Sequence, residues 1–190
     1  IAYVGDPFEN GGDQFDENTA SMQSSLKVRQ ALSTCIDREG INEVIIDGMG
    51  KPAYLATLQS SDPMWQANAE AWTLPYDCEA GKALLAEAGH GDGFHVVMWQ
   101  GFNGAQTETM DAIGNNWLNQ FNVTYEIDKR SYSTIRPGLV NHSQPFLRMH
   151  PCCWQPAVWP LEHIWSSHGA PGGYNHGYDM PAAAAAVPIK

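Results

Sequence analysis

In the first half of the chain, hydrophobic residues recur three and four positions apart, the spacing of one helical face. This pattern predicts a helix over 26–36 and a second short helix from Ile41 to Gly48. Glycine readily adopts the conformation that closes helices, so Gly48 marks the end. Asp77 can cap a third helix over 78–88, since its carboxylate can accept hydrogen bonds from the unpaired amides of the first turn.

The segment between the second and third helices has a different character. Residues 50–75 contain Pro52, Pro63 and Pro75. Proline removes a backbone donor and breaks helices from within. The sequence therefore predicts an extended surface segment here.

The second half alternates between strand and helix periods. Apolar residues at every second position predict strands near 94–98 and 123–127, and helical spacing predicts a helix over 107–120 between them. A third short strand is expected over 146–149, and residues 1–4 are expected to end a strand. Strands alternating with helices are typical of βαβ units, so we predict an α/β sheet with some parallel pairing.

Charge and composition exclude several classes of partner. The chain has 190 residues, with 10 Lys and Arg against 21 Asp and Glu, and a net charge of −11. Such an acidic chain is a poor candidate for nucleic acid or an anionic membrane surface. No apolar run approaches the roughly 20 residues that span a bilayer. Residues 1–15 lack the features of a signal peptide, so any export leader is expected to have been removed.

Four cysteines are present, and their spacing does not determine which of them pair. They are Cys35, Cys78 and the adjacent Cys152 and Cys153. Neighbouring cysteines rarely bridge each other, because the geometry strains the intervening peptide. The sequence has no CxxC motif.

Several motifs resemble one known family. KVRQAL at 27–32 and IDRE at 36–39 are similar to a helix of the extracellular solute-binding proteins of peptide, nickel and oligosaccharide ABC importers. PYD at 75–77 with KALLAEAG at 82–89, and DGF at 92–94, follow in that family's order. A later turn with Tyr174, Asn175, Gly177, Tyr178 and Pro181 is also similar.

This resemblance implies a fold and a domain organisation. The fold would be α/β, one lobe of a class II periplasmic-binding-protein (venus-flytrap) fold with a mixed sheet flanked by helices. Residues 26–181 would form the second-lobe domain, 1–25 a loop or inter-lobe segment, and 182–190 a tail. Family members are far longer and close two lobes over a ligand, so the chain is expected to be a fragment.

The resemblance also implies a function. The protein would be an exported, periplasmic or extracellular component of an ABC importer. It would bind a small polar solute, a peptide or an oligosaccharide-like molecule, between two lobes and deliver it to the permease. Contact with a membrane would come only through the permease or a lipid anchor outside this chain. No enzymatic activity and no cofactor are expected.

One departure from the family's pattern bears on the ligand. Peptide-binding members carry an acidic residue after a tryptophan, and that acid pairs with the amino terminus of the peptide. Pro156 falls at the position of this acid and Trp159 at that of a second one. A buried ammonium group without a carboxylate partner is costly. This departure favours a neutral, hydroxyl-rich ligand or a peptide held differently.

In such sheets, ligands bind at the loops beyond the carboxyl ends of the strands, here 99–106, 128–133 and 150–160. Aromatic rings with a few amides and imidazoles suit a polar ligand. The alternative is that these residues pack the lobe or lie in an ordinary surface loop. The predicted ligand-binding residues are Trp99, Gln100, Phe102 and Asn103 in the loop after the strand near 94–98, and His150, Trp154, Gln155 and Trp159 further on.

Two other chemistries compete with solute binding. The first is a copper, nickel or zinc site, since thiolate, thioether and imidazole are ligands of soft metals. The second is a hydrolase that uses Cys152 or Cys153, although GxSxG, P-loop and Rossmann motifs are absent. The metal alternative would use Met149, His150, Cys152, Cys153, His163 and His168.

Overall fold

The computed structural model describes residues 2–3, 26–52, 54, 61–100, 105–131, 133–134, 137 and 147–149. The chain divides into two compact units. One consists of residues 1–24, 99–102 and 129–190, and the other of residues 25–98 and 103–128. The second unit, called the helical unit below, holds the helices that lie between residues 26 and 121.

The described strands form one mixed sheet, in the order β1-β4-β2-β3. Strand β1 (Ala2–Tyr3) pairs antiparallel with β4 (Leu147–Met149), and Ala2 lies opposite Arg148. Strands β2 (His95–Gln100) and β3 (Thr124–Lys129) are joined by helix α6 (Ala105–Phe121). The predicted mixed α/β sheet is therefore confirmed.

Two backbone hydrogen bonds show that β2 and β3 run parallel. The amide of Thr124 donates to the carbonyl oxygen of Phe94 at 2.9 Å, and the amide of Arg130 donates to that of Gln100 at 3.1 Å. Both residues of the second bond lie six positions further along than those of the first, so the strands point the same way. Their carboxyl ends therefore meet at one edge of the sheet.

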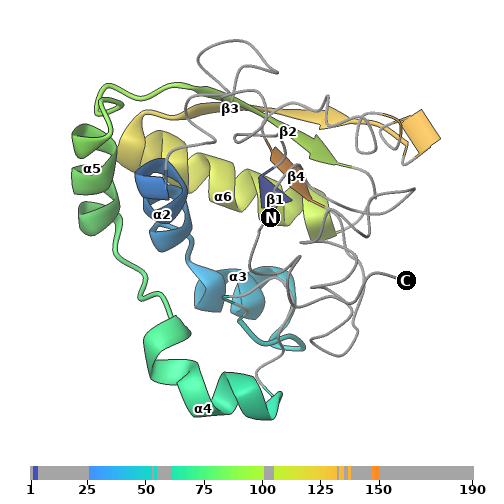
Figure 1. Ribbon diagram of the computed structural model, residues 1–190. Coiled ribbons are helices and arrows are strands. Elements are labelled where there is room, and N and C mark those ends of the chain that lie inside the picture. Colours follow the sequence, from blue (N-terminus) through green and yellow to red (C-terminus); the bar gives the residue numbers. More distant parts are fainter. Residues whose placement is uncertain are drawn as a thin grey trace, which may run out of the picture. The chain divides into compact units, whose positions relative to one another are not determined.

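Helix α6 lies at the centre of the helical unit (Figure 1), and its apolar face is buried. Met110, Ile113 and Trp117 are buried on this helix, as their spacing predicts. The indole nitrogen of Trp117 donates to the carbonyl oxygen of Leu32 at 2.9 Å, so the buried N–H has a partner. Leu118 was predicted on the same face but is 38% exposed, because the buried face of α6 is narrower than the apolar pattern.

Helices α2 (Leu26–Thr34) and α5 (Cys78–Glu87) pack side by side (Figure 1). Gly81 permits their close approach, since a β-carbon there would lie 2.9 Å from the carbonyl oxygen of Ala31. At the exposed rim, Lys27 Nζ lies 2.8 Å from Glu87 Oε2. The hydrogen bond from Lys27, and then its positive charge, hold the pKa of Glu87 below its usual value.

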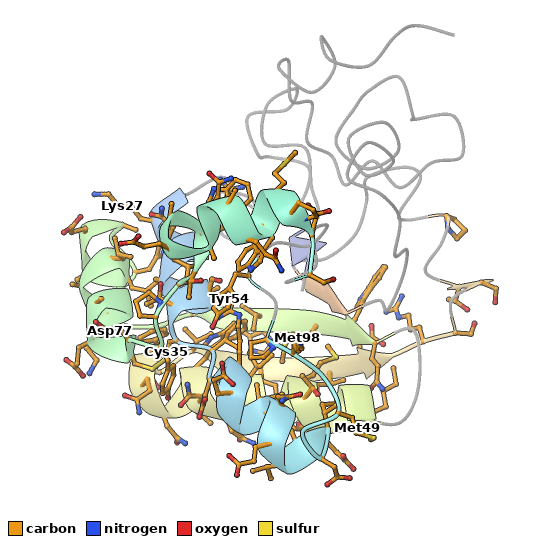
Figure 2. The ribbon with its side chains drawn as sticks, turned by 90° about the horizontal axis from the view of Figure 1, so that it is seen from below. Lys27, Cys35, Met49, Tyr54, Asp77 and Met98 are labelled. Atoms are coloured by element: carbon orange, nitrogen blue, oxygen red, sulfur yellow. A yellow bond between two sulfur atoms is a disulfide. The ribbon has the colours of Figure 1, made fainter. Side chains whose placement is uncertain are left out.

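A disulfide joins the end of α2 to the start of α5. Cys35, labelled in Figure 2, is bonded to Cys78. Their Cα atoms are 4.5 Å apart. The amide nitrogen of Asn116, on α6, donates to the carbonyl oxygen of Cys35 at 2.9 Å. Three helices therefore meet at this bond, a pairing that spacing alone did not determine.

Capping carboxylates explain where several of the helices begin. Asp77 accepts a hydrogen bond from the amide of Ala80 at 2.9 Å and begins α5, as predicted. Helix α3 (Arg38–Ile45) starts three residues before the predicted position, because Asp37 caps it by accepting from Gly40 at 2.9 Å.

The extended segment predicted over 50–75 is wrong in part. Residues Pro63–Trp72 form helix α4. Asp62 caps it by accepting from the amide of Met64 at 2.8 Å, and Pro63 occupies the first turn, where no amide partner is needed. Proline therefore starts a helix here instead of excluding one. Among the described residues, none of the helices is both long and apolar enough to cross a membrane.

Candidate functional site

The best-defined candidate site is the carboxyl end of β2. Trp99 and Gln100 were predicted in the loop after this strand, but the structure places them as its last two residues. Trp99 is 7% exposed and Gln100 is 2% exposed. The run of buried residues continues to the end of the strand, so the boundary is later than the alternation of apolar residues indicated.

Arg130, directly after β3, lies against the end of β2. Its guanidinium carbon is 4.9 Å from the centroid of the Trp99 ring, a cation–π distance. Its backbone amide donates to the carbonyl oxygen of Gln100 at 3.1 Å. The hydrogen bond sets the position of the Arg130 backbone, and the indole orients its side chain. All three residues belong to the same compact unit.

Sequence reasoning singled out the loop 128–133 but not Arg130 itself. One feature of the sequence could have drawn attention to Arg130. Lys129 and Arg130 are the one pair of adjacent Lys or Arg residues in the chain. In a chain with a net charge of −11, a local pair of cations at the end of a strand is unusual. The stacking partner, Trp99, is thirty residues away and becomes visible only in the parallel pairing of β2 and β3.

A second arginine stacks on an aromatic ring in the helical unit. The guanidinium carbon of Arg38 lies 5.1 Å from the centroid of the Tyr54 ring. Tyr54 in turn stacks on Trp65, with centroids 5.9 Å apart and ring planes 6° apart. Arg38 also donates to the carbonyl and hydroxyl oxygens of Ser33, at 2.9 and 2.8 Å. Its donors serve backbone and side-chain acceptors within the helical unit, so this cluster is structural.

The remaining predicted ligand-binding residues lie outside the described part of the structure. They are Phe102, Asn103, His150, Trp154, Gln155 and Trp159. The structure thus places Trp99 and Gln100 together at the end of β2 and adds Arg130 to the candidate site. The other residues stay predicted ligand-binding residues.

The metal alternative falls almost entirely outside the described residues. Of its ligands, only Met149 is described, and only as part of β4. Within the described ranges, no group of three or more His, Cys, Asp and Glu side chains could hold a metal ion. Cys152 and Cys153, on which the hydrolase alternative depends, also lie outside the described residues.

A protein-family model matches most of the chain. Residues 11–144 match the model of the bacterial extracellular solute-binding proteins, family 5, middle region. The chain belongs to this family. The resemblance drawn from the motifs at 27–39 and 75–94 is therefore confirmed.

Curated relatives of this family 5 chain match over shorter stretches. It is 39% identical over 75 residues to the heme-binding protein A of Haemophilus influenzae, covering 40% of the chain and 13% of the relative. It is 31% identical over 107 residues to the glutathione-binding protein GsiB of Salmonella typhimurium, covering 53% and 19%. The matches thus cover less than a fifth of each of these relatives.

Solved structures confirm the fold of this family 5 chain. The agropinic acid complex of the binding protein AgaA, from A. tumefaciens R10, matches with a TM-score of 0.71 at 20% identity. That match covers 90% of the chain and 35% of AgaA. HbpA2 of Haemophilus parasuis matches with a TM-score of 0.68 at 20% identity, covering 92% and 33%. The expected class of fold, a lobe of a class II periplasmic binding protein, is confirmed.

Proposed function

We propose that the protein is the solute-binding component of an ABC importer and acts outside the cytoplasm. It binds a small polar solute, a peptide or an oligosaccharide-like molecule, and delivers it to the permease. The match to family 5 over residues 11–144 is the observation that carries this proposal. The names of the relatives support a peptide or another small organic solute, since they include glutathione-binding and dipeptide-binding proteins.

The residues at the ends of β2 and β3 support this proposal. Trp99, Gln100 and Arg130 lie where β2 and β3 end, and ligands of open α/β sheets bind at the carboxyl ends of strands. An aromatic ring, an amide and a guanidinium offer the apolar face and polar groups that a small polar ligand needs. Phe102, Asn103, His150, Trp154, Gln155 and Trp159 remain proposed contributors from the neighbouring loops.

The mechanism proposed is binding without turnover. A solute held between two lobes favours a closed conformation over an open one, and the permease recognises the closed form. The chain covers 35% of AgaA and 33% of HbpA2, and we propose that a part of the protein outside this chain forms the partner lobe. The Cys35–Cys78 disulfide supports an oxidising compartment such as the periplasm or the extracellular space.

Native mass spectrometry of the whole protein tests the proposal. A small organic adduct that is lost on denaturation would support it and would give the mass of the solute. Isothermal titration with dipeptides, glutathione, hemin and maltotriose would then identify the chemical class. Binding of none of these, together with a metal ion as the sole adduct, would overturn the proposal and favour the Met/His/Cys metal alternative.

A further inference from the structure

We infer that the Cys35–Cys78 disulfide is a site of reversible thiol–disulfide exchange. A small thiol without negative charge attacks Cys78, releases Cys35 and leaves Cys78 capped as a mixed disulfide. The site lies where α2, α5 and α6 meet, and it involves none of the residues of the candidate site at the end of β2.

The two sulfur atoms differ in accessibility. Cys35 is 0% exposed, whereas Cys78 is partly exposed at the first position of α5. Exchange requires an incoming thiolate to reach one sulfur of the disulfide. In the folded protein an external thiol can therefore attack Cys78 but not Cys35, and Cys35 is the sulfur that leaves.

The exchange step balances without any further reactant. The incoming thiol loses its proton to solvent, and its sulfur bonds to Cys78 Sγ as the bond between Cys78 and Cys35 breaks. The electron pair of the broken bond stays on Cys35, which leaves as a thiolate and then takes up a proton. The incoming thiol is oxidised and Cys35 is reduced.

Asn116, on α6, supports the departure of Cys35. Burial disfavours a thiolate, so the leaving sulfur needs a hydrogen-bond donor. The side-chain nitrogen of Asn116 lies 3.3 Å from Cys35 Sγ and 3.7 Å from Cys78 Sγ, so the donor is nearer to the sulfur that leaves. The same nitrogen donates to the Cys35 carbonyl oxygen at 2.9 Å, and the Tyr76 hydroxyl donates to Asn116 Oδ1 at 3.3 Å. These two bonds hold the amide in place.

The backbone around the cysteines favours closing the bond again. The amide of Asp77 donates to the carbonyl oxygen of Thr34 at 3.0 Å, which joins the two residues that directly precede the cysteines. Helices α2 and α5 also pack together. None of these contacts needs the S–S bond, so they keep the released Cys35 close to the mixed disulfide. Such proximity acts as a high effective concentration, and the exchange is reversible.

The charges beside Cys78 select the thiol. Asp77 and Glu79 flank it in the sequence, and the chain has a net charge of −11. Lys82 Nζ lies 3.3 Å from Glu79 Oε1 and offsets part of that charge. A negative field lowers the local concentration of anions. A neutral or cationic thiol should therefore react faster than an anionic thiol of similar size.

Peptide mapping of the whole protein tests which sulfur is attacked. The folded protein is treated with cysteamine, sampled at early times, and its free thiols are alkylated with N-ethylmaleimide in denaturant. We expect the mixed disulfide on Cys78 and the maleimide on Cys35. The reverse pattern, or no mixed disulfide at either cysteine, would overturn the inference. An opening rate that is independent of cysteamine concentration and equal to the unfolding rate would also overturn it.

A pair of thiols tests the role of charge. Cysteamine is cationic and 3-mercaptopropionate is anionic, and each rate is divided by the rate of the same thiol with a small model disulfide. The normalised rate is expected to be at least about threefold higher for cysteamine. Equal normalised rates would show that the charges beside Cys78 do not select the thiol.

An asparagine pair tests the donor to the leaving sulfur. Asn116→Ala is expected to slow opening by cysteamine about 2- to 10-fold, the factor for the loss of one hydrogen bond. Asn115→Ala, at the adjacent exposed position of α6, is the matched control and should leave the rate unchanged. Equal effects of the two substitutions would remove Asn116 from the mechanism. Thermal unfolding reports whether each variant is folded, and if Asn116→Ala is not, the mapping of wild type still decides the inference.

Discussion

The ring of Tyr125, on β3, lies directly against Gly114 in the middle of α6. A β-carbon on Gly114 would be 2.6 Å from three carbons of that ring. Gly114 is buried, and its lack of a side chain allows the helix to approach the strand closely. This contact lies within the β2–α6–β3 unit. Trp99 belongs to the same unit, near the carboxyl end of β2.

Replacing Gly114 with alanine is expected to destabilise the protein despite the better helix propensity of alanine. Alanine gains about 1 kcal/mol over glycine in a helix, while overpacking costs about 1–3 kcal/mol. We expect a net loss of up to about 2 kcal/mol in the free energy of unfolding, measured by urea denaturation. In a Tyr125→Ala background the ring is gone, so Gly114→Ala should become neutral or stabilising. An equal loss in both backgrounds would contradict the packing argument.

The hydroxyl group of Tyr125 predicts a loss of stability at alkaline pH. It donates to Asp111 Oδ1 at 3.2 Å. Burial, then the negative charge of Asp111 and this hydrogen bond, raise the pKa of Tyr125 above its usual value. A raised folded-state pKa contributes stability that is fully present below about pH 10, the unfolded pKa. The contribution is lost as pH rises through the folded pKa.

Urea denaturation between pH 8 and pH 11 checks this dependence. Tyr125→Phe should lower stability at pH 8 by about 0.5–1.5 kcal/mol and should flatten the decline above pH 10. Asp111→Asn keeps the burial and removes the charge, so it should reduce the decline without abolishing it. An unchanged alkaline decline in Tyr125→Phe would assign it to other groups.

The Cys35–Cys78 disulfide is expected to stabilise the helical unit by about 2–4 kcal/mol. It closes a loop with a sequence separation of 43 and joins two helices that already pack together. The double variant Cys35→Ala, Cys78→Ala should therefore unfold at a lower urea concentration than wild type.

Dithiothreitol separates this bond from the other cysteines. It should lower the unfolding midpoint of wild type toward that of the double variant. It should have little effect on the double variant itself. A large effect of reduction in the double variant would indicate that Cys152 or Cys153 also forms a stabilising disulfide.

Asp77 is expected to contribute to the start of α5 through its side chain. It accepts from the amide of Ala80, which no intrahelical carbonyl serves. Asp77→Ala should lower the free energy of unfolding by about 0.5–2 kcal/mol, and Asp77→Asn, which keeps the acceptor, should cost much less. Equal losses for the two variants would show that the charge matters more than the hydrogen bond.

Local patterns were sufficient for most of the secondary structure and for the family. Helix α6 and strand β2 follow from apolar spacing, because burial of one face is a local property of the sequence. The start of α5 could also be predicted from Asp77, since a capping side chain bonds to an amide only three residues further along the sequence. Pro63 misled the prediction because proline both breaks helices from within and begins them at the first turn. The neighbouring Asp62 distinguishes a proline that begins a helix from one that breaks it, because its carboxylate caps the first turn.

The sequence by itself determined the order of the helices and strands apart from helix α4, the acidic charge, and the motifs that place the chain in family 5. The tertiary structure decided which distant residues meet. It paired Cys35 with Cys78, placed the ring of Tyr125 against Gly114, and brought Arg130 over Trp99. These contacts join residues far apart along the chain, and they depend on how helices pack and how strands align. No local spacing encodes that alignment, so the juxtaposition of Arg130 and Trp99 at the ends of β2 and β3 depends on the tertiary structure.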